Sequence, residues 1–369
     1  MTLVNVDLGE RSHPVRIESG GLDWAGQMLA PFARDGRIVV VTDRNVLAAQ
    51  GDRLTAGLNG AGILPDGIVI APGEETKDWS HLARLVDDLV ARGVGRGDHV
   101  VAFGGGVIGD LVGFAAAILE RGVGLIHVPT SLVAMVAGSV GGRTAINTPS
   151  GRNIVGAVHQ PSFVLIDPDC LDSLPVRELR AGYAEVVKHG LGGDPDFFAW
   201  CEANGSILLA GDQTARELAI AECVRMKAAA VAEDERDETG GRALLDLGHG
   251  FAQAIEAESN YRLLRGEAVA IGLCLAFRLS SERGLCPAGD AERVEAHLRA
   301  VALPTSLNEA GLAADGERLA ERIRHDRKAT EDKVRLTLAR GIGEAVVADA
   351  VPLNDIAAFL DRQRQPLDA

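Results

Sequence analysis

The sequence predicts an α/β protein of two domains, in which a Rossmann-like domain with a parallel β-sheet precedes a mainly α-helical domain. Short apolar runs alternate with helical stretches in the first half, whereas little strand pattern follows residue 175. The length of 369 residues is more typical of two domains sharing a cleft than of a single hydrophobic core. We therefore expect a Rossmann-like α/β domain at residues 1–174 and an α-helical domain at residues 175–369.

Four apolar runs in the first half predict β-strands, at residues 37–42, 67–70, 99–103 and 123–128. Apolar strands separated by helices are typical of a parallel sheet covered on both faces. Residues 1–8 alternate like a further strand and lack the basic start and apolar run of an export signal. A cytoplasmic location is therefore expected.

Four helical stretches are predicted for the second half, at residues 178–191, 214–233, 243–258 and 267–283. Little strand pattern separates them, which favours a mainly α-helical second domain. The polar tail from Asp361 is expected to fray.

Composition and charge argue against several classes of protein. Hydrophobic residues make up 47% and charged residues 24%, as in ordinary globular proteins. The net charge of −15 disfavours nucleic acid and anionic membranes as partners. The five cysteines form no CxxC pair, so we interpret them as buried packing residues rather than disulfides or metal ligands.

Three consecutive glycines, Gly104 to Gly106, lie between the strand at 99–103 and a helical run. Backbone amides and a helix N-terminus at such a turn can bind a pyrophosphate, although a tight strand-to-helix turn needs similar residues. Polar segments at Pro72 to Lys77 and Pro129 to Ser131 also follow predicted strands. An open α/β sheet builds its ligand crevice at these strand ends, so the context favours an anionic ligand.

Four ordered motifs in the chain resemble those of the 3-dehydroquinate synthase family, within the sugar phosphate cyclases. They are GGGVIGD at 104–110, VPTS at 128–131, SVGGRT at 139–144 and GYAEVVK at 182–188. The resemblance extends from about Asp43 to residues 326–328. It implies an NAD-binding Rossmann-like domain, a helical domain with a divalent metal such as zinc, and a homodimer.

The family's chemistry, as the resemblance implies it, is that of a biosynthetic carbon–oxygen lyase. Bound NAD transiently oxidises an alcohol of a phosphorylated sugar-like substrate, which acidifies the neighbouring C–H bond and permits loss of phosphate. Reduction, ring opening and intramolecular aldol closure then give a carbocycle. The substrate is expected to be phosphorylated and carboxylated.

The resemblance also implies which residues bind the two ligands. NAD is expected at Asp43, Glu74, Lys77, Gly104, Gly105, Gly106, Asp110, Thr130 and Ser131. For Glu74 and Lys77 the alternative is a solvent-exposed ion pair. The substrate is expected at Arg121, Arg143, Asn153, Lys227, Arg242, Asp246, Gln253 and Lys328. The basic residues in this set suit a substrate with two negative charges, although each of them alone is more often a surface residue. Arg143 stands where the motif usually has lysine.

The expected metal site departs from the family pattern. The resemblance places the three metal ligands at Glu185, His249 and Arg265, so an arginine stands where the family has a histidine. Three further active-site positions differ: Ala137 replaces an aspartate, Asp246 an asparagine and Gln253 a histidine. The residues that steer the reaction are therefore altered, and a divergent product is an open alternative.

Two interpretations of the altered centre are open. In the first, Asp246 and His249 lie i, i+3 on one helical face and bind zinc, manganese or iron together with Glu185. In the second, Arg265 fills the vacated space and its guanidinium pairs with Glu185 or Asp246. We favour the second, because two unit charges about 4 Å apart repel by about 4 kcal/mol at an effective dielectric of about 20, and a divalent ion doubles this. An arginine pointing to solvent would leave the metal in place.

The sequence thus predicts an NAD-dependent cyclase-family enzyme. Lys188 and His249 are the expected acid and base groups, with Glu185 and Arg265 beside them. One alternative is an NAD- and metal-dependent alcohol dehydrogenase of the glycerol-dehydrogenase type, which leaves the anion-binding residues unexplained. Another is a non-catalytic homologue that binds NAD or stabilises an active relative.

Overall fold

A computed structural model describes residues 1–149, 151–236, 245–260, 262–326 and 332–364. The chain divides into two compact units, Met1–Pro175 with Gly211–Arg236, and Val176–Ala210 with Asp237–Ala369. The division after Pro175 lies one residue from the expected boundary. Residues 211–236 differ from the expectation because their helix packs against the first strand of the first unit. The assignment of a ligand to each domain stays a prediction.

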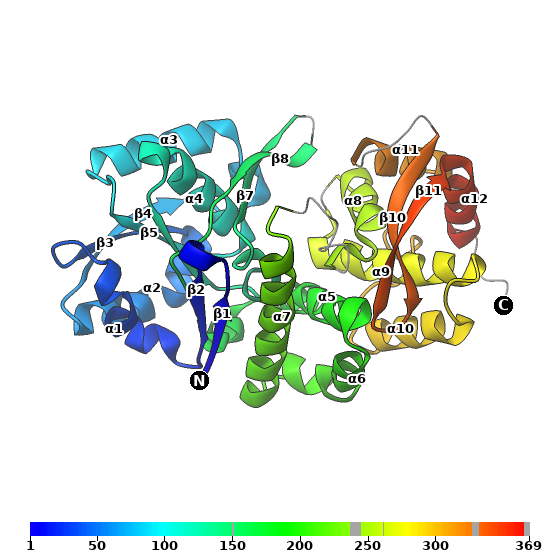
Figure 1. The fold of residues 1–369 in the computed structure, drawn as a ribbon, viewed down its shortest axis with the longest axis horizontal. Helices are drawn as coiled ribbons and strands as arrows, with labels where there is room; N and C mark the ends of the chain where they lie inside the picture. The colour runs from blue at the N-terminus through cyan, green and yellow to red at the C-terminus, as the bar shows by residue number, and fades with distance from the viewer. Residues whose placement is uncertain (150, 237–244, 261, 327–331, 365–369) are drawn as a thin grey trace. The chain divides into compact units, whose positions relative to one another are not determined.

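The first unit is built on a seven-stranded sheet with the order β1-β2-β9-β6-β5-β3-β4. Figure 1 labels β1 to β5 of this sheet. All neighbouring strands are parallel except β1 and β2. The strands are β1 (Thr2–Val6), β2 (His13–Ile17), β3 (Arg37–Asp43), β4 (Leu64–Ile70), β5 (His99–Gly104), β6 (Gly124–Pro129) and β9 (Phe163–Ile166). The four strands predicted between residues 37 and 128 are confirmed as β3 to β6, and the N-terminal strand as β1.

The helices of the first unit cover this sheet. They are α1 (Ala25–Leu29), α2 (Arg44–Gly60), α3 (Trp79–Ala91), α4 (Gly106–Ile118) and α7 (Gln213–Glu233). Short 3₁₀ turns are η1 (Gly9–Arg11), η2 (Gly21–Trp24), η3 (Ala30–Phe32), η4 (Glu74–Thr76), η5 (Leu119–Arg121) and η7 (Pro168–Ser173), and η6 (Ala134–Gly138) is π-helical. The almost wholly apolar α4 buries Leu111, Val112 and Phe114 in the core.

A separate antiparallel hairpin, β7 (Arg143–Thr148) and β8 (Gly151–Val158), packs its first strand against α4. The contact is close at Gly113, where an added Cβ atom would lie 2.4 Å from Cγ2 of Thr144. Glycine is therefore required there so that the hairpin can approach the helix. This approach places the hairpin beside the strand ends from which the expected ligand-binding residues come.

The second unit is mainly helical, as predicted. Its helices are α5 (Val176–Gly193), α6 (Pro195–Leu209), α8 (His249–Glu258), α9 (Arg265–Glu282), α10 (Ala288–Ala300), α11 (Gly316–Asp326) and α12 (Leu353–Arg364). The prediction missed an antiparallel hairpin of β10 (Lys333–Gly341) and β11 (Glu344–Pro352). The helix predicted at 243–258 begins only at His249, because Gly248 has a φ of +71° and starts the helix there.

The five cysteines are all buried, which agrees with their interpretation as packing residues. Burial raises the pKa of Cys201 and of Cys274 to about 12, so neither is a thiolate near neutral pH. Within the described part of the chain, every helix is too short or too polar to cross a membrane.

Candidate active site

The glycine turn joins the end of β5 to the start of α4. A Cβ atom added to Gly104 would lie 2.6 Å from Cγ1 of Ile108, so packing alone requires this glycine. An added Cβ atom at Gly106 would have nothing within 4 Å, and at Gly105 it would meet only Ser131, at 3.5 Å. The backbone at the first turn of α4 therefore faces open space, which suits the phosphate oxygens of a dinucleotide.

A small pocket lies against this turn and includes the neighbouring strand end. It is lined by Gly104, Gly105, Gly106, Asp110, Pro129 and Ser139, among others. The Thr130 amide donates to the Gly104 carbonyl at 3.0 Å, which ties the end of β6 to the turn. Ser131 Oγ would lie 3.5 Å from a Cβ atom added to Gly105, so the structure places both expected NAD residues beside the glycines.

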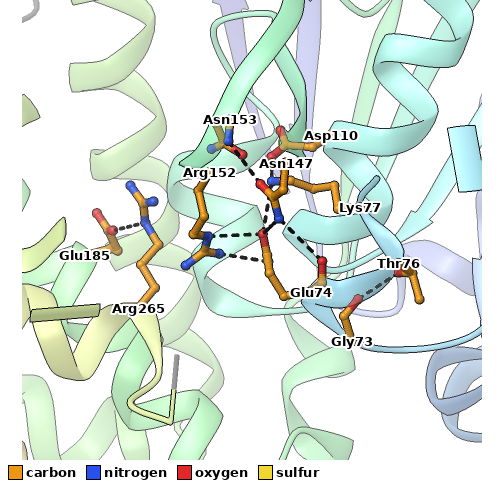
Figure 2. A network of polar contacts seen from close by, with 10 residues as sticks. All are labelled: Gly73, Glu74, Thr76, Lys77, Asp110, Asn147, Arg152, Asn153, Glu185 and Arg265. Atoms are coloured by element: carbon orange, nitrogen blue, oxygen red, sulfur yellow. Dashed lines mark hydrogen bonds and ion pairs between the residues drawn. The ribbon is translucent and has the colours of Figure 1, made fainter. Parts of the chain in front are cut away.

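Lys77 belongs to a network of charges around Glu74 in the first unit (Figure 2). Its Nζ atom lies 2.6 Å from Oδ2 of Asp110 and 3.5 Å from Oε1 of Glu74. The Lys77 side chain is only 3% exposed, so the interpretation of a solvent-exposed pair is wrong for this lysine. The structure thus brings three of the expected NAD residues together.

Two residues that the sequence analysis missed hold Glu74 in place. Arg152 donates to Oε1 of Glu74 from Nε at 3.1 Å and lies 2.8 Å from Oε2 through its terminal nitrogen. Asn147 donates from Nδ2 to the same Oε1 at 2.7 Å (Figure 2). Burial alone would raise the pKa of Glu74, but the charges of Lys77 and Arg152 lower it. Both new residues come from the β7–β8 hairpin.

The remaining predicted ligand residues of the first unit occupy varied positions. Asp43 caps α2, since its Oδ1 atom accepts hydrogen bonds from the amides of Asn45 and Val46 at 2.8 and 3.0 Å. The expected substrate residues Arg121, Arg143 and Asn153 are exposed, and Lys227 is half-buried on α7. Arg242 and Lys328 lie outside the described residues.

The second unit places Glu185 between two cations. Its side chain on α5 is 1% exposed, and Lys188 Nζ lies 2.5 Å from Oε2, one helical turn further on. Arg265 Nε lies 3.4 Å from Oε1 (Figure 2). Burial alone would raise the pKa of Glu185, but Lys188 and Arg265 hold it well below its usual value. Glu185 is therefore an ionised carboxylate in the folded protein.

The position of Arg265 is fixed by the way α9 begins. A Cβ atom added to Gly266 would lie 1.7 Å from the Ala181 carbonyl oxygen, so the start of α9 touches α5 one turn before Glu185. Glu267 accepts a hydrogen bond from the Leu264 amide at 2.8 Å and pairs with Arg177 at 2.7 Å. The cap and the close contact together hold Arg265 beside Glu185.

Asp246 and His249 do not share one α-helix, so the predicted i, i+3 spacing on a helical face is wrong. His249 is the first residue of α8, whereas Asp246 precedes Gly248 and lies outside the α-helix. Gly248 also contacts α9, because a Cβ atom added to Gly272 would lie 2.5 Å from the Gly248 carbonyl oxygen. Asp246, His249 and Gln253 are all half-buried, with Gln253 one turn after His249.

The donor atoms of this centre do not fit the three-ligand metal site that the family implies. Across the described residues, no three His, Cys, Asp or Glu side chains form a group that could hold a metal ion. Both carboxylate oxygens of Glu185 contact a cation instead, and one of these cations is Arg265, at the position for which the resemblance predicts the third ligand.

His127 lies beneath the glycine turn and gives stability a predictable pH dependence. Burial first, and then the nearby His13 and His159, lower its pKa to about 4. The unfolded chain takes up a proton near pH 6.5, whereas the folded protein does so only near pH 4. We expect this group to remove about 2 kcal/mol of stability between pH 7 and pH 4.5. Urea unfolding of the wild type and of His127→Gln checks this, since equal pH slopes would contradict it.

Comparison with known proteins agrees with this architecture. The family models described as 3-dehydroquinate synthase N-terminal and C-terminal match residues 67–181 and 182–329. A 3-dehydroquinate synthase of Zymomonas mobilis is 49% identical over 360 residues, which cover 97% of this chain and 95% of the relative. One from Rhodospirillum rubrum is 52% identical over 350 residues, covering 94% and 91%.

A solved structure shows the same fold. The 2-epi-5-epi-valiolone synthase of Streptomyces hygroscopicus, with NAD+ and Zn2+ bound, is 30% identical and superposes with a TM-score of 0.87 over 96% of this chain and 97% of its own. The Rossmann-like sheet and helical second unit are thus those of the sugar phosphate cyclases. Within this class, the chain belongs to the 3-dehydroquinate synthase family, which confirms the resemblance found in the sequence.

Proposed function

We propose that this protein is an NAD-dependent cyclase that converts a heptulosonate-type phosphate into a carbocycle with release of phosphate. The proposal is carried by one observation: about half of the residues are identical to those of relatives named 3-dehydroquinate synthase, over nearly the full length of the chain. The substrate is phosphorylated and carboxylated, as the basic residues Arg121, Arg143 and Lys227 suggest.

NAD binding is supported by the glycine turn and by the relative solved with NAD+. Gly105 and Gly106 leave the first turn of α4 open, and Thr130 and Ser131 lie beside it. Lys77, Asp110 and Glu74 would complete this site. When bound, NAD would supply the transient oxidation of a substrate alcohol, which acidifies the adjacent C–H bond.

The chain's own residues would then bind anions and move protons. Lys188 is the proposed acid and base group, because its side chain is nearly buried and its Nζ atom is held in place 2.5 Å from Oε2 of Glu185. His249 at the first turn of α8 is the second proposed proton carrier. The protein would work as a homodimer in the cytoplasm.

Phosphate release tests the proposal directly. Purified protein with NAD and a heptulosonate phosphate should release one phosphate per carbocycle formed, without accumulation of NADH. A heptulose phosphate without the carboxylate should react more slowly. Accumulation of NADH with glycerol would instead support a polyol dehydrogenase, and a folded protein that releases no phosphate would be a non-catalytic homologue. Mass spectrometry identifies the product.

Gly106→Ala tests the glycine turn separately. We expect the affinity for NAD to fall roughly tenfold, equivalent to about 1.4 kcal/mol, because the new methyl group projects into the open space in which the dinucleotide binds. The fold should remain, since nothing in the protein lies within 4 Å of that methyl group. Titration of NAD measured by calorimetry gives the change.

Gly60→Ala is the matched control. Gly60 is also a helical residue with nothing within 4 Å of an added Cβ atom, but it ends α2 instead of starting α4. The control should bind NAD like the wild type. An unchanged affinity in Gly106→Ala would remove the turn from the NAD site.

A further inference from the structure

We propose that the guanidinium of Arg265 takes the place of the divalent ion in this protein, so that an organic cation cluster of Arg265 and Lys188 around Glu185 stabilises the substrate's anionic oxygen. That this oxygen belongs to a cyclase substrate depends on the proposed function. The structural part of the proposal, the replacement of the ion, stands on contacts in the second unit alone.

The first step of the argument is the charge around Glu185. A metal-ligand carboxylate turns an oxygen to the ion, but here Oε2 contacts Lys188 at 2.5 Å and Oε1 contacts Arg265 at 3.4 Å. Two basic side chains thus contact a carboxylate that is 1% exposed. A divalent ion added at this place would meet two like charges and would lose an imidazole ligand.

The second step is that Arg265 is held in position by its helix. Gly266 brings the start of α9 into contact with the backbone of α5, and Glu267 caps the same turn. These contacts limit the distance over which the arginine backbone can withdraw from Glu185. The arginine side chain is still 33% exposed, so a ligand oxygen can reach it.

The third step is the chemistry that a guanidinium supplies. It stays protonated, carries five N–H donors in a planar fork and matches anionic oxygens in two-point hydrogen bonds. It does not polarise an alkoxide as strongly as a divalent Lewis acid. We therefore expect phosphate release that is slower than in a metal-dependent relative but insensitive to chelators.

The wild-type protein gives the first test. Purified protein incubated with Co2+ or Zn2+ and then desalted should retain less than one tenth of an ion per chain, as measured by elemental analysis. Phosphate release should be the same with and without EDTA. Retention of one ion per chain, or loss of activity in EDTA, would overturn the proposal.

Arg265→His gives the second test, because it restores an imidazole where the family has its third ligand. We expect Co2+ affinity to rise at least tenfold over the wild type, with visible cobalt absorption bands. Arg262→His is the matched control, since Arg262 precedes the same helix, is exposed and bonds the Ser259 carbonyl. It should bind cobalt like the wild type.

These readouts separate the two proposals. Cobalt binding in Arg265→His without phosphate release in any variant would support the replacement and reject the cyclase function. A folded Arg265→His that binds no more cobalt than Arg262→His would reject the replacement, whatever the activity. Thermal unfolding of each variant shows that it is folded.

Discussion

Replacement of Lys188 by methionine is expected to lower kcat for phosphate release by roughly 10²- to 10⁴-fold, the usual contribution of a positioned acid or base. The Lys188 ammonium is held 2.5 Å from Oε2 of Glu185, so its position is fixed before substrate binds. Methionine keeps the length and apolar character of the side chain but removes the proton carrier. Steady-state measurements of phosphate release give kcat and KM, and KM should change far less than kcat.

The same substitution should lower stability, because Glu185 is buried and would keep only the more distant contact with Arg265. Removing one partner of a buried ion pair costs about 3 to 5 kcal/mol, and the remaining arginine places the expected loss near the lower end, about 3 kcal/mol. Urea unfolding measures this loss, and NAD titration confirms that the first unit remains folded.

Lys333→Met is the control for both effects. Lys333 begins β10 and is exposed, so its replacement should leave kcat unchanged and stability within about 0.5 kcal/mol of the wild type. A Lys188→Met enzyme that keeps more than a tenth of the wild-type kcat would show that another group transfers the proton.

The parallel sheet could be predicted because its strands are apolar over their whole length. Residues such as Val39, Val41, Val100 and Leu125 are buried in a sheet that helices cover, so an unbroken apolar run was sufficient. The β10–β11 hairpin lacked this signal. The second strand is mostly half-buried or exposed, and its pattern does not alternate regularly. Its pairing depends on contacts between distant parts of the chain.

Local spacing also decided which parts of the site could be predicted. Glu185 and Lys188 lie i, i+3 on one helix, so their pairing follows from helical geometry. Arg152 and Glu74 are 78 residues apart and meet only because the β7–β8 hairpin packs against α4. A helix through Asp246 and His249 was the wrong expectation, because the left-handed Gly248 interrupts it.

Lys77→Met is expected to destabilise the protein by about 3 kcal/mol and to weaken NAD binding. The lysine is almost fully buried and lies 2.6 Å from Asp110 and 3.5 Å from Glu74. Its loss removes the cation that contacts both carboxylates, while Glu74 keeps its pair with Arg152. Removing one partner of a buried ion pair lowers stability by more than the pair contributes, because the remaining charge is poorly solvated. Urea unfolding and NAD calorimetry measure the two effects.

A double-mutant cycle with Asp110→Asn distinguishes this cause from a general packing defect. If the loss of the cation beside the Asp110 carboxylate is responsible, the double variant Lys77→Met/Asp110→Asn should be more stable than Lys77→Met, with a coupling energy of about 1 to 3 kcal/mol. Arg335→Met breaks the exposed pair with Asp349 and should cost less than about 1 kcal/mol. Two results would contradict the role of Lys77 as the cation that keeps two carboxylates together at the glycine turn. One is additive losses of stability in the cycle, and the other is a loss of stability in Lys77→Met no larger than that in Arg335→Met.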